Sequence, residues 1–161
     1  MVNFIIACSF RFIAYFFFGF ALEIFFVAVS KITDGKIAGR DKYLEGKTYL
    51  WMIPIYGILL LGVFEPLFHL VHEWPWYCRF LLWAVSFTFF EGLTGWLYDK
   101  MLGFCPWDYS KDKWKVFERG YTKWSLLPMW GIAGLVIEHY SALMVYLSPH
   151  VITFILQTYF S

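Results

Sequence analysis

Charged residues are scarce in this sequence, and their scarcity argues against a soluble fold. Of the 161 residues, 16% are charged, 60% are hydrophobic and 24% are aromatic. An average soluble domain carries about 25% charged residues, and so apolar a chain would lack the polar surface to cover its core. The net charge of +1 also argues against a nucleic-acid partner, which requires a basic surface. The composition therefore indicates an integral membrane protein.

The common signatures of catalysis and cofactor binding are also missing. The three cysteines, Cys8, Cys78 and Cys105, have no metal-ligand spacing and form no disulfide framework, although a bond between Cys8 and Cys78 stays open. The sequence has no Gly-x-x-x-x-Gly-Lys-Ser/Thr phosphate loop, no His-rich metal box and no Ser-His-Asp order. We therefore expect no metal, no cofactor and no catalytic residue, and an enzyme acting on lipids is the least favoured function.

Long hydrophobic runs take the place of these signatures. Four stretches are nearly free of charge, and each has at least the roughly 20 residues that a helix needs to cross the hydrocarbon core. They do not alternate polar with apolar residues as membrane strands do, and helices satisfy their own backbone in lipid. The sequence therefore predicts an all-α polytopic bundle in a single domain, residues 1–161, without a recognisable internal repeat. The predicted spans are residues 2–29, 49–71, 76–97 and 124–147.

A further apolar segment, residues 151–160, is too short to span a membrane. Ser148 and Pro149 precede it, and a proline inside a helix removes a backbone hydrogen bond. We therefore expect a helix break there, followed by a short interfacial or re-entrant helix. A fifth span is the alternative.

The basic residues predict the orientation of the chain. Eleven of the thirteen Lys and Arg residues lie in two segments, 31–47 and 98–123. With four spans both segments lie on one side of the membrane, and the positive-inside tendency makes that side cytoplasmic. Both termini then face outward. The basic segments also suit contact with anionic lipid headgroups.

Each span contains a single glutamate: Glu23, Glu65, Glu91 and Glu138. A charged acid at mid-bilayer costs at least about 2.5 kcal/mol, so each needs a partner, a proton or water. The helical rise places Glu23 and Glu91 roughly 9 Å inside the cytoplasmic boundary. Glu65 and Glu138 lie in the outer half, at a depth similar to that of Arg11. We therefore predict that Arg11 pairs with Glu65, with Glu138 or with both.

Two interpretations of these residues remain open. The acids and Arg11 either hold the bundle together or line a polar cavity for a solute, an ion or a lipid headgroup. Thr94 joins the candidate cavity, because it shares a helical face with Glu91. The cytoplasmic residues Trp107, Asp108 and Tyr109 could close over that cavity. Alternatively, Asp108 forms an Asx-turn while the two aromatic residues anchor the loop at the interface.

These motifs resemble known membrane families. Glu91-Gly-Leu-Thr-Gly-Trp-Leu-Tyr, followed by Cys105-Pro-Trp-Asp-Tyr-Ser, resembles the transmembrane protein 229 family and the related bacterial family labelled putative ABC-transporter type IV (CmpB-like). Gly19-Phe-Ala-Leu-Glu23, Pro54-Ile-Tyr-Gly57 with Glu65, and Leu135-Val-Ile-Glu138 fit as well. The resemblance covers residues 10 to 145. It implies a small multi-pass membrane protein, with a transporter label that rests on association.

Two functions follow as expectations. The favoured one is a transport or permease component for a small polar or amphiphilic solute, with the glutamates along its path. The alternative is a non-catalytic membrane subunit or lipid-binding scaffold. The expected partners are membrane lipids, together with further membrane subunits or a second copy of the chain. Any ATP hydrolysis would belong to a partner, because the phosphate loop is missing.

Overall fold

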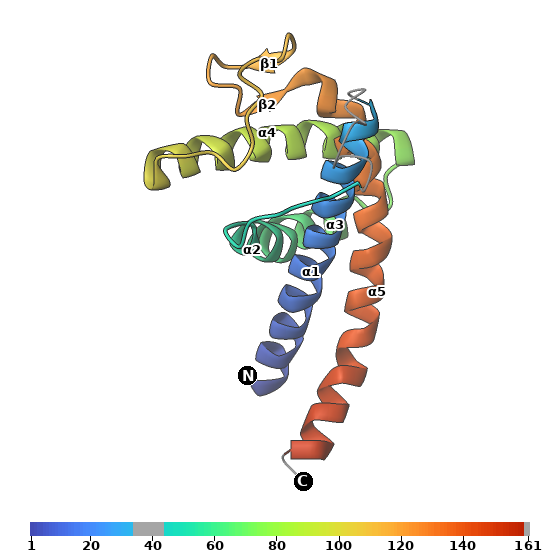
Figure 1. The fold of residues 1–161 in the computed structure, drawn as a ribbon. Coiled ribbons are helices and arrows are strands. Elements are labelled where there is room, and N and C mark those ends of the chain that lie inside the picture. The colour runs from blue at the N-terminus through green and yellow to red at the C-terminus, as the bar shows by residue number, and fades with distance from the viewer. Residues whose placement is uncertain (34–43, 160–161) are drawn as a thin grey trace. The chain divides into compact units, whose positions relative to one another are not determined.

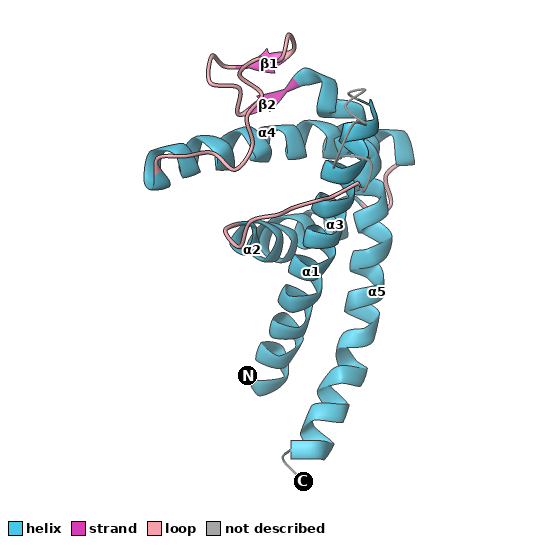
Figure 2. Cartoon of the chain, viewed as in Figure 1, coloured by secondary structure: helices cyan, strands magenta, loops and turns pink. Residues whose placement is uncertain are grey.

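The structure, a computed structural model that describes residues 1–33 and 44–159, consists almost entirely of helices (Figures 1 and 2). The second span has three consecutive parts, the first and third spans are single long helices, and the fourth begins with a short 3₁₀ turn before its long helix. A two-stranded hairpin precedes the last helix. The elements are α1 (Val2–Thr33), α2 (Met52–Pro54), η2 (Ile55–Phe64), α3 (Glu65–Val71), α4 (Trp76–Leu102), β1 (Lys115–Val116), β2 (Thr122–Lys123), η3 (Trp124–Leu126) and α5 (Leu127–Tyr159).

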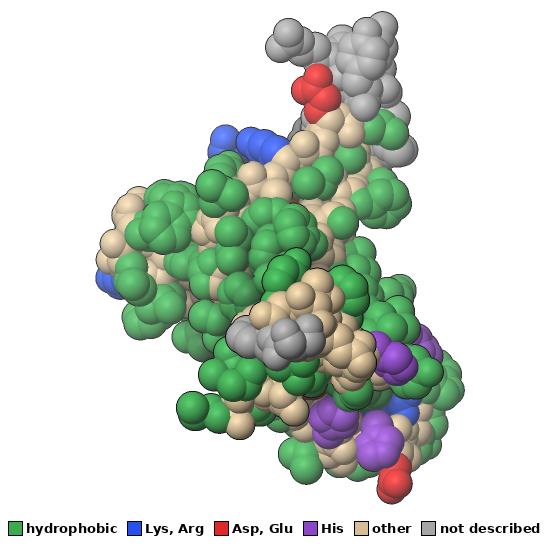
Figure 3. Space-filling model, turned by 90° about the horizontal axis from the view of Figure 1, so that it is seen from below, with side chains coloured by type: hydrophobic (Ala, Val, Ile, Leu, Met, Phe, Trp, Pro, Cys, Tyr) green, Lys and Arg blue, Asp and Glu red, His purple; other side chains and the backbone are tan. Residues whose placement is uncertain are grey.

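Four helical stretches within the described residues are long and apolar enough to cross a membrane: Val2–Val29, Met52–Val71, Trp76–Leu102 and Trp124–Tyr159. Large hydrophobic side chains are exposed along them, and Figure 3 shows hydrophobic side chains over much of the visible surface. Exposed apolar area on this scale needs lipid or another partner to cover it. The chain is therefore an integral multi-pass membrane protein, as its composition predicts.

The third predicted span is longer than expected at its C-terminal end. Helix α4 starts after Pro75, which suits the entry to a helix because it offers no backbone N–H. It ends at Gly103, whose φ of 75° is left-handed and favours glycine. Five residues beyond Leu97 therefore remain helical although Asp99 and Lys100 are charged.

The predicted break at Ser148 and Pro149 is wrong. Residues 151–159 are helical, as expected, but they continue α5 without interruption. The hydroxyl of Ser148 donates to the carbonyl of Met144 at 2.8 Å, and that of Thr153 donates to Pro149 at 3.0 Å. Neighbouring hydroxyls of this kind help membrane helices accommodate a proline.

The second span contains a π-helix, η2, over ten residues. A π-helix forms i→i+5 hydrogen bonds and is rare in proteins, where it usually accommodates one extra residue near a functional site. Glu65 follows directly after this stretch. The π-helix therefore sets the direction in which the Glu65 side chain points from the helix axis.

The short hairpin positions several polar side chains. Strands β1 and β2 pair antiparallel, with Lys115 opposite Lys123 and Val116 opposite Thr122. Between them Phe117 and Gly120 have φ values of 64° and 66°, and this left-handed backbone closes the loop. The buried residues Tyr121 and Thr122 then face the rest of their unit.

The chain divides into two compact units. The first comprises Met1–Pro66 and Met144–Ser161, and the second comprises Leu67–Leu143. Tyr15 and Phe64 are the most deeply buried large side chains of the first unit, and Trp83 is that of the second. Every polar network below lies inside one unit. The single integral membrane domain over residues 1–161 stays a prediction, and residues 34–43 of the basic segment 31–47 lie outside the described residues.

Candidate functional site: the glutamates of the spans

Glu65 of the first unit is neutralised by an arginine. Arg11 Nε lies 3.1 Å from Glu65 Oε2, and Tyr15 donates its hydroxyl to the same oxygen at 2.7 Å. Arg11 Nη1 also donates to Ser148 Oγ at 3.1 Å. The Glu65 carboxyl group is buried, and the Arg11 guanidinium supplies the positive charge that balances it. The predicted pairing of Arg11 with Glu65 is confirmed.

Glu138 of the second unit is also neutralised by an arginine, but Arg11 is not its partner. Arg79 Nε donates to Glu138 Oε1 at 2.9 Å, and Trp83 Nε1 donates to that oxygen at 2.6 Å. Arg79 further donates to the carbonyls of His72 and Trp74, which tie it to the end of the span. Arg79 lies near the start of the third predicted span, and no signal in the sequence pairs it with Glu138.

Glu23 and Glu91 have different surroundings. Thr48 Oγ1 and Tyr56 Oη donate to Glu23 Oε2 at 2.7 and 3.0 Å. Thr122 Oγ1 and Trp130 Nε1 donate to Glu91 Oε2 at 2.5 and 3.1 Å. No Lys or Arg of the described segments forms an ion pair with either acid. Each carboxyl group is therefore held by uncharged donors.

Glu91 receives a third bond from the loop that follows α4. Tyr109 Oη lies 3.2 Å from Glu91 Oε1. Lys123 is the nearby cation, but it pairs with Asp112 at 2.7 Å and lies over the Tyr109 ring, 5.0 Å from its centroid. We call Glu91, Tyr109, Thr122 and Trp130 the Glu91 cage.

Each of the two interpretations of the loop after α4 fits a different residue of that loop. Tyr109 reaches Glu91, which fits the loop closing over the acid. Asp108 accepts the backbone N–H of Ser110 at 2.8 Å and forms an Asx-turn, and the bonds from Ser110 hold the pKa of this carboxyl below its usual value. Trp107 donates to the carbonyl of Tyr121 at 2.6 Å. Its indole thus fastens the loop to the hairpin.

The Thr94 hydroxyl is not among the donors to the Glu91 carboxyl group. Its hydroxyl donates to the carbonyls of Phe90 and Glu91, at 2.7 and 3.2 Å, within its own helix. A part for Thr94 in a cavity stays a prediction. The cage residues that sequence reasoning missed, Thr122 and Trp130, are 31 and 39 residues from Glu91.

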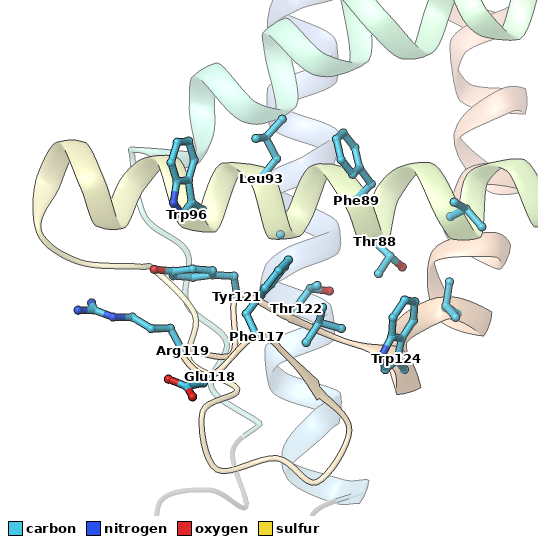
Figure 4. A pocket seen from close by; sticks show the side chains of 14 residues that line it. Thr88, Phe89, Leu93, Trp96, Phe117, Glu118, Arg119, Tyr121, Thr122 and Trp124 are labelled. Carbon is cyan, nitrogen blue, oxygen red and sulfur yellow. The ribbon is translucent and has the colours of Figure 1, made fainter.

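An apolar cavity of about 840 Å³ lies beside the Glu91 cage in the second unit. Figure 4 shows Phe89, Leu93 and Trp96 projecting from α4, with Thr88 pointing toward the 116–124 segment. Glu118 and Arg119 lie at one end of the cavity. Thr122 is shared: it lines the cavity and donates to Glu91. Thr122 therefore connects the lining of the apolar cavity with the carboxyl group of Glu91.

Asp99 fixes the C-terminal end of α4. Arg119 Nη1 lies 2.8 Å from both carboxylate oxygens, and Tyr121 Oη donates to one of them at 2.6 Å. This hydrogen bond to Asp99 raises the pKa of Tyr121. Burial raises the pKa of the nearby Cys105 thiol to about 11, so Cys105 is a poor nucleophile at neutral pH.

The chain matches one family model over residues 10–160, that of the family described as "Putative ABC-transporter type IV". No curated protein and no solved structure matches it. The resemblance to the transmembrane protein 229 family lies outside this match and stays a prediction. Within the described residues, no group of three or more His, Cys, Asp or Glu side chains could hold a metal ion.

Proposed function

Because the chain belongs to the type IV ABC-transporter (CmpB) family, whose model covers residues 10–160, we propose that it is the membrane-spanning component of a transport system. In this proposal Glu91 receives the polar group of an amphiphilic solute. The apolar body of the solute occupies the cavity beside the cage. ATP hydrolysis, where it is needed, belongs to a partner protein, because the sequence lacks a phosphate loop.

The difference between the two kinds of intramembrane acid carries the proposal. Glu65 and Glu138 each have an arginine, and such pairs serve the fold. Glu91 has three uncharged donors, two on Oε2 and one on Oε1. A carboxylate offers about four acceptor positions. A protonated amine or another donor group can therefore bind at the remaining position and supply the missing positive charge.

The cavity supports an amphiphilic solute over a purely polar one. Its volume falls within the roughly 300–1,000 Å³ of common small-molecule sites. Its lining is almost wholly apolar, with Phe89, Leu93 and Trp96 along α4. Thr122 belongs to this lining and also donates to Glu91. An alkyl chain in the cavity would thus place its polar end next to the cage.

The sidedness of the chain belongs to the same proposal. The basic segments 31–47 and 98–123 face the cytoplasm, and both termini face outward. The Glu91 cage uses side chains from the second of these segments, Tyr109 and Thr122. The solute would therefore meet Glu91 near the cytoplasmic side of the membrane.

Binding of a fluorescent alkylamine to the full chain in lipid nanodiscs tests the proposal. We expect saturable energy transfer from the protein's tryptophans to a dansyl-labelled alkylamine, and much weaker transfer to the matching alkyl alcohol. Glu91→Gln should weaken amine binding by about 10-fold or more, because a hydrogen bond to a charged group contributes about 1.5–3 kcal/mol.

Two threonine variants provide a matched control. Thr122→Val removes one donor to Glu91, whereas Thr88→Val removes a hydroxyl that also lines the cavity but donates to the carbonyl of Ala84. We expect Thr122→Val to alter amine affinity several-fold and Thr88→Val to leave it unchanged. Equal affinity of the wild type and Glu91→Gln for the amine would rule the proposal out.

A lipid-binding scaffold is the second candidate. The exposure of Phe117 (68%) and of the Arg119 side chain (69%) at the edge of the cavity favours it. A bilayer lipid could place its chain among these apolar residues and its phosphate near Arg119. Equal binding of the alcohol and the amine, together with loss of copurifying lipid in Arg119→Gln, would favour the scaffold.

A further inference from the structure

The first span of each unit carries the same pattern of residues. An Arg-Phe pair is followed after two residues by Tyr or Trp, and after seven more by Glu. The second copy lies 68 positions after the first. The matched residues are Arg11 and Arg79, Phe12 and Phe80, Tyr15 and Trp83, and Glu23 and Glu91.

The second span of each unit repeats as well. The shared pattern is Gly-x-Thr, five residues, then Pro-x-Tyr/Trp-Gly-Ile, and the copies are 74 positions apart. The matched residues are Gly46 and Gly120, Thr48 and Thr122, Pro54 and Pro128, Tyr56 and Trp130, Gly57 and Gly131, and Ile58 and Ile132. Chance identity would not explain matches that also make the same contacts.

The ion pairs are the first contact that repeats. Arg11 pairs with Glu65 in the first unit, and Arg79 pairs with Glu138 in the second. One helical turn further along, Tyr15 and Trp83 each donate to the carboxyl oxygen that the arginine faces. Both units thus build the same triad of arginine, aromatic donor and glutamate.

The hydrogen bonds to the other two glutamates repeat in the same way. Thr48 and Tyr56 donate to one oxygen of Glu23, as Thr122 and Trp130 donate to one oxygen of Glu91. The helix packing agrees. A side chain placed on Gly57 would strike the ring of Phe12, and one placed on Gly131 would strike the ring of Phe80.

The π-helix explains the irregularity within the second span. Glu65 lies nine residues after Tyr56, whereas Glu138 lies eight residues after Trp130. The extra residue falls within η2, and its i→i+5 bonds take up one additional residue. Both glutamates therefore reach their arginines despite the difference in length.

We infer that the chain consists of two copies of one helix-pair unit, and that Glu23 with Thr48 and Tyr56 is a second carboxylate site equivalent to the Glu91 cage. The protein thus has two sites of the same chemical class, each a carboxyl held by a threonine and an aromatic donor, each open to a cationic or donor group. The ligand class rests on the proposed function. The duplication rests on the repeated residues and contacts alone.

Modification of the full-length protein in native membranes by dicyclohexylcarbodiimide tests the inference. This apolar reagent adds to a protonated carboxyl, and the adduct rearranges to a stable N-acylurea without losing an atom. Mass spectrometry of the peptides should find Glu23 and Glu91 modified to within about threefold of each other. Glu65 and Glu138 should be modified at least tenfold less, because arginine keeps them ionised.

Two matched valine variants test whether each threonine acts only on the glutamate to which it donates. Thr48→Val should raise the modification of Glu23 several-fold and leave Glu91 unchanged, and Thr122→Val should do the reverse, because each loses a donor that stabilises the carboxylate. A saturating alkylamine should slow modification at both acids.

Modification of Glu91 without Glu23, or protection of Glu91 alone by the amine, would overturn the equivalence and leave the proposed function intact. Loss of amine binding is measured separately in Glu91→Gln, so a failure of the proposed function appears there. If neither acid reacts while Glu65 or Glu138 does, the inference is wrong whatever that binding assay gives.

Discussion

The four glutamates fall into two pairs with different chemical surroundings. Glu65 and Glu138 face guanidinium groups, and Glu23 and Glu91 face hydroxyl and indole donors. A buried carboxylate next to arginine contributes to the fold only while its partner is present. A carboxyl held by uncharged donors can still accept a proton or a ligand cation. The same residue type therefore has two roles, set by the neighbour that the fold supplies.

Removing one member of an ion pair should destabilise the protein strongly. Arg79→Ala leaves Glu138, which is 3% exposed, without its counter-charge. Breaking a buried pair in this way costs about 3–5 kcal/mol. We expect a large fall in the melting temperature of the detergent-solubilised protein, and substantial recovery in Arg79→Gln/Glu138→Gln, where no charge remains buried.

Glu73→Gln is the control for this experiment. The Glu73 side chain is 86% exposed and its contact with His72 is long, at 3.9 Å, and exposed pairs contribute at most about 1 kcal/mol. Its melting temperature should match that of the wild type. An Arg79→Ala protein as stable as Glu73→Gln would show that the pair has no structural role.

The helices adapt their local geometry to keep these side chains in register. In η2 a π-helix accommodates one residue more than the corresponding part of α5. In α5 the chain passes Pro149 without ending, with the hydroxyls of Ser148 and Thr153 bonded to nearby carbonyls. In both places the chain stays helical, although local propensity alone predicts an interruption of the helix.

Deleting one residue from the π-helix should therefore be tolerated. Gly62 is exposed, and a side chain added there would meet nothing within 4 Å. Its deletion gives Tyr56 and Glu65 the spacing of Trp130 and Glu138 and lets an α-helix form. We expect a monodisperse, folded protein by size-exclusion chromatography in detergent, with a melting temperature close to that of the wild type.

Deletion of Val136 is the matched control. This exposed residue lies between Trp130 and Glu138 in a regular α-helix. Its loss turns Glu138 by roughly 100° about the helix axis, away from Arg79. This protein should aggregate or lose most of its yield. Equal damage from both deletions would contradict the explanation of the π-helix as an inserted residue.

The molecule as a whole carries its basic residues on two segments, and this asymmetry predicts its orientation. Single cysteines at positions 73 and 111, in a variant whose three native cysteines are alanine, would report the two sides. Glu73→Cys should react with an impermeant maleimide on intact cells. Lys111→Cys should react only after the cells are permeabilised.

The reverse pattern of labelling would place segment 98–123 outside and invert the proposed path of the solute. Labelling of both positions on intact cells would indicate mixed insertion, which contradicts a single orientation. Both positions lie in the second unit, so the measurement does not depend on how the two units are arranged.

The sequence alone determined that this chain spans a membrane and where its four spans lie. Length and hydropathy are local properties, and lipid imposes helices on any segment that crosses it. The helical rise of about 1.5 Å per residue predicts that Glu23 and Glu91 lie at a different depth from Glu65 and Glu138. The fold gives the same two pairs different partners.

Only the tertiary structure decided which side chains meet. The rise along a helix gives depth but not which neighbouring helix a side chain faces, so Arg79 was overlooked as the partner of Glu138. Thr48 and Thr122 lie 25 and 31 residues from the glutamates they bind, and a lone threonine has no recognisable pattern. The internal repeat was missed because its offset changes from 68 to 74 positions, and the shared contacts reveal it. Hydrophobicity acts on each segment by itself, whereas partner choice depends on packing between segments far apart in the chain.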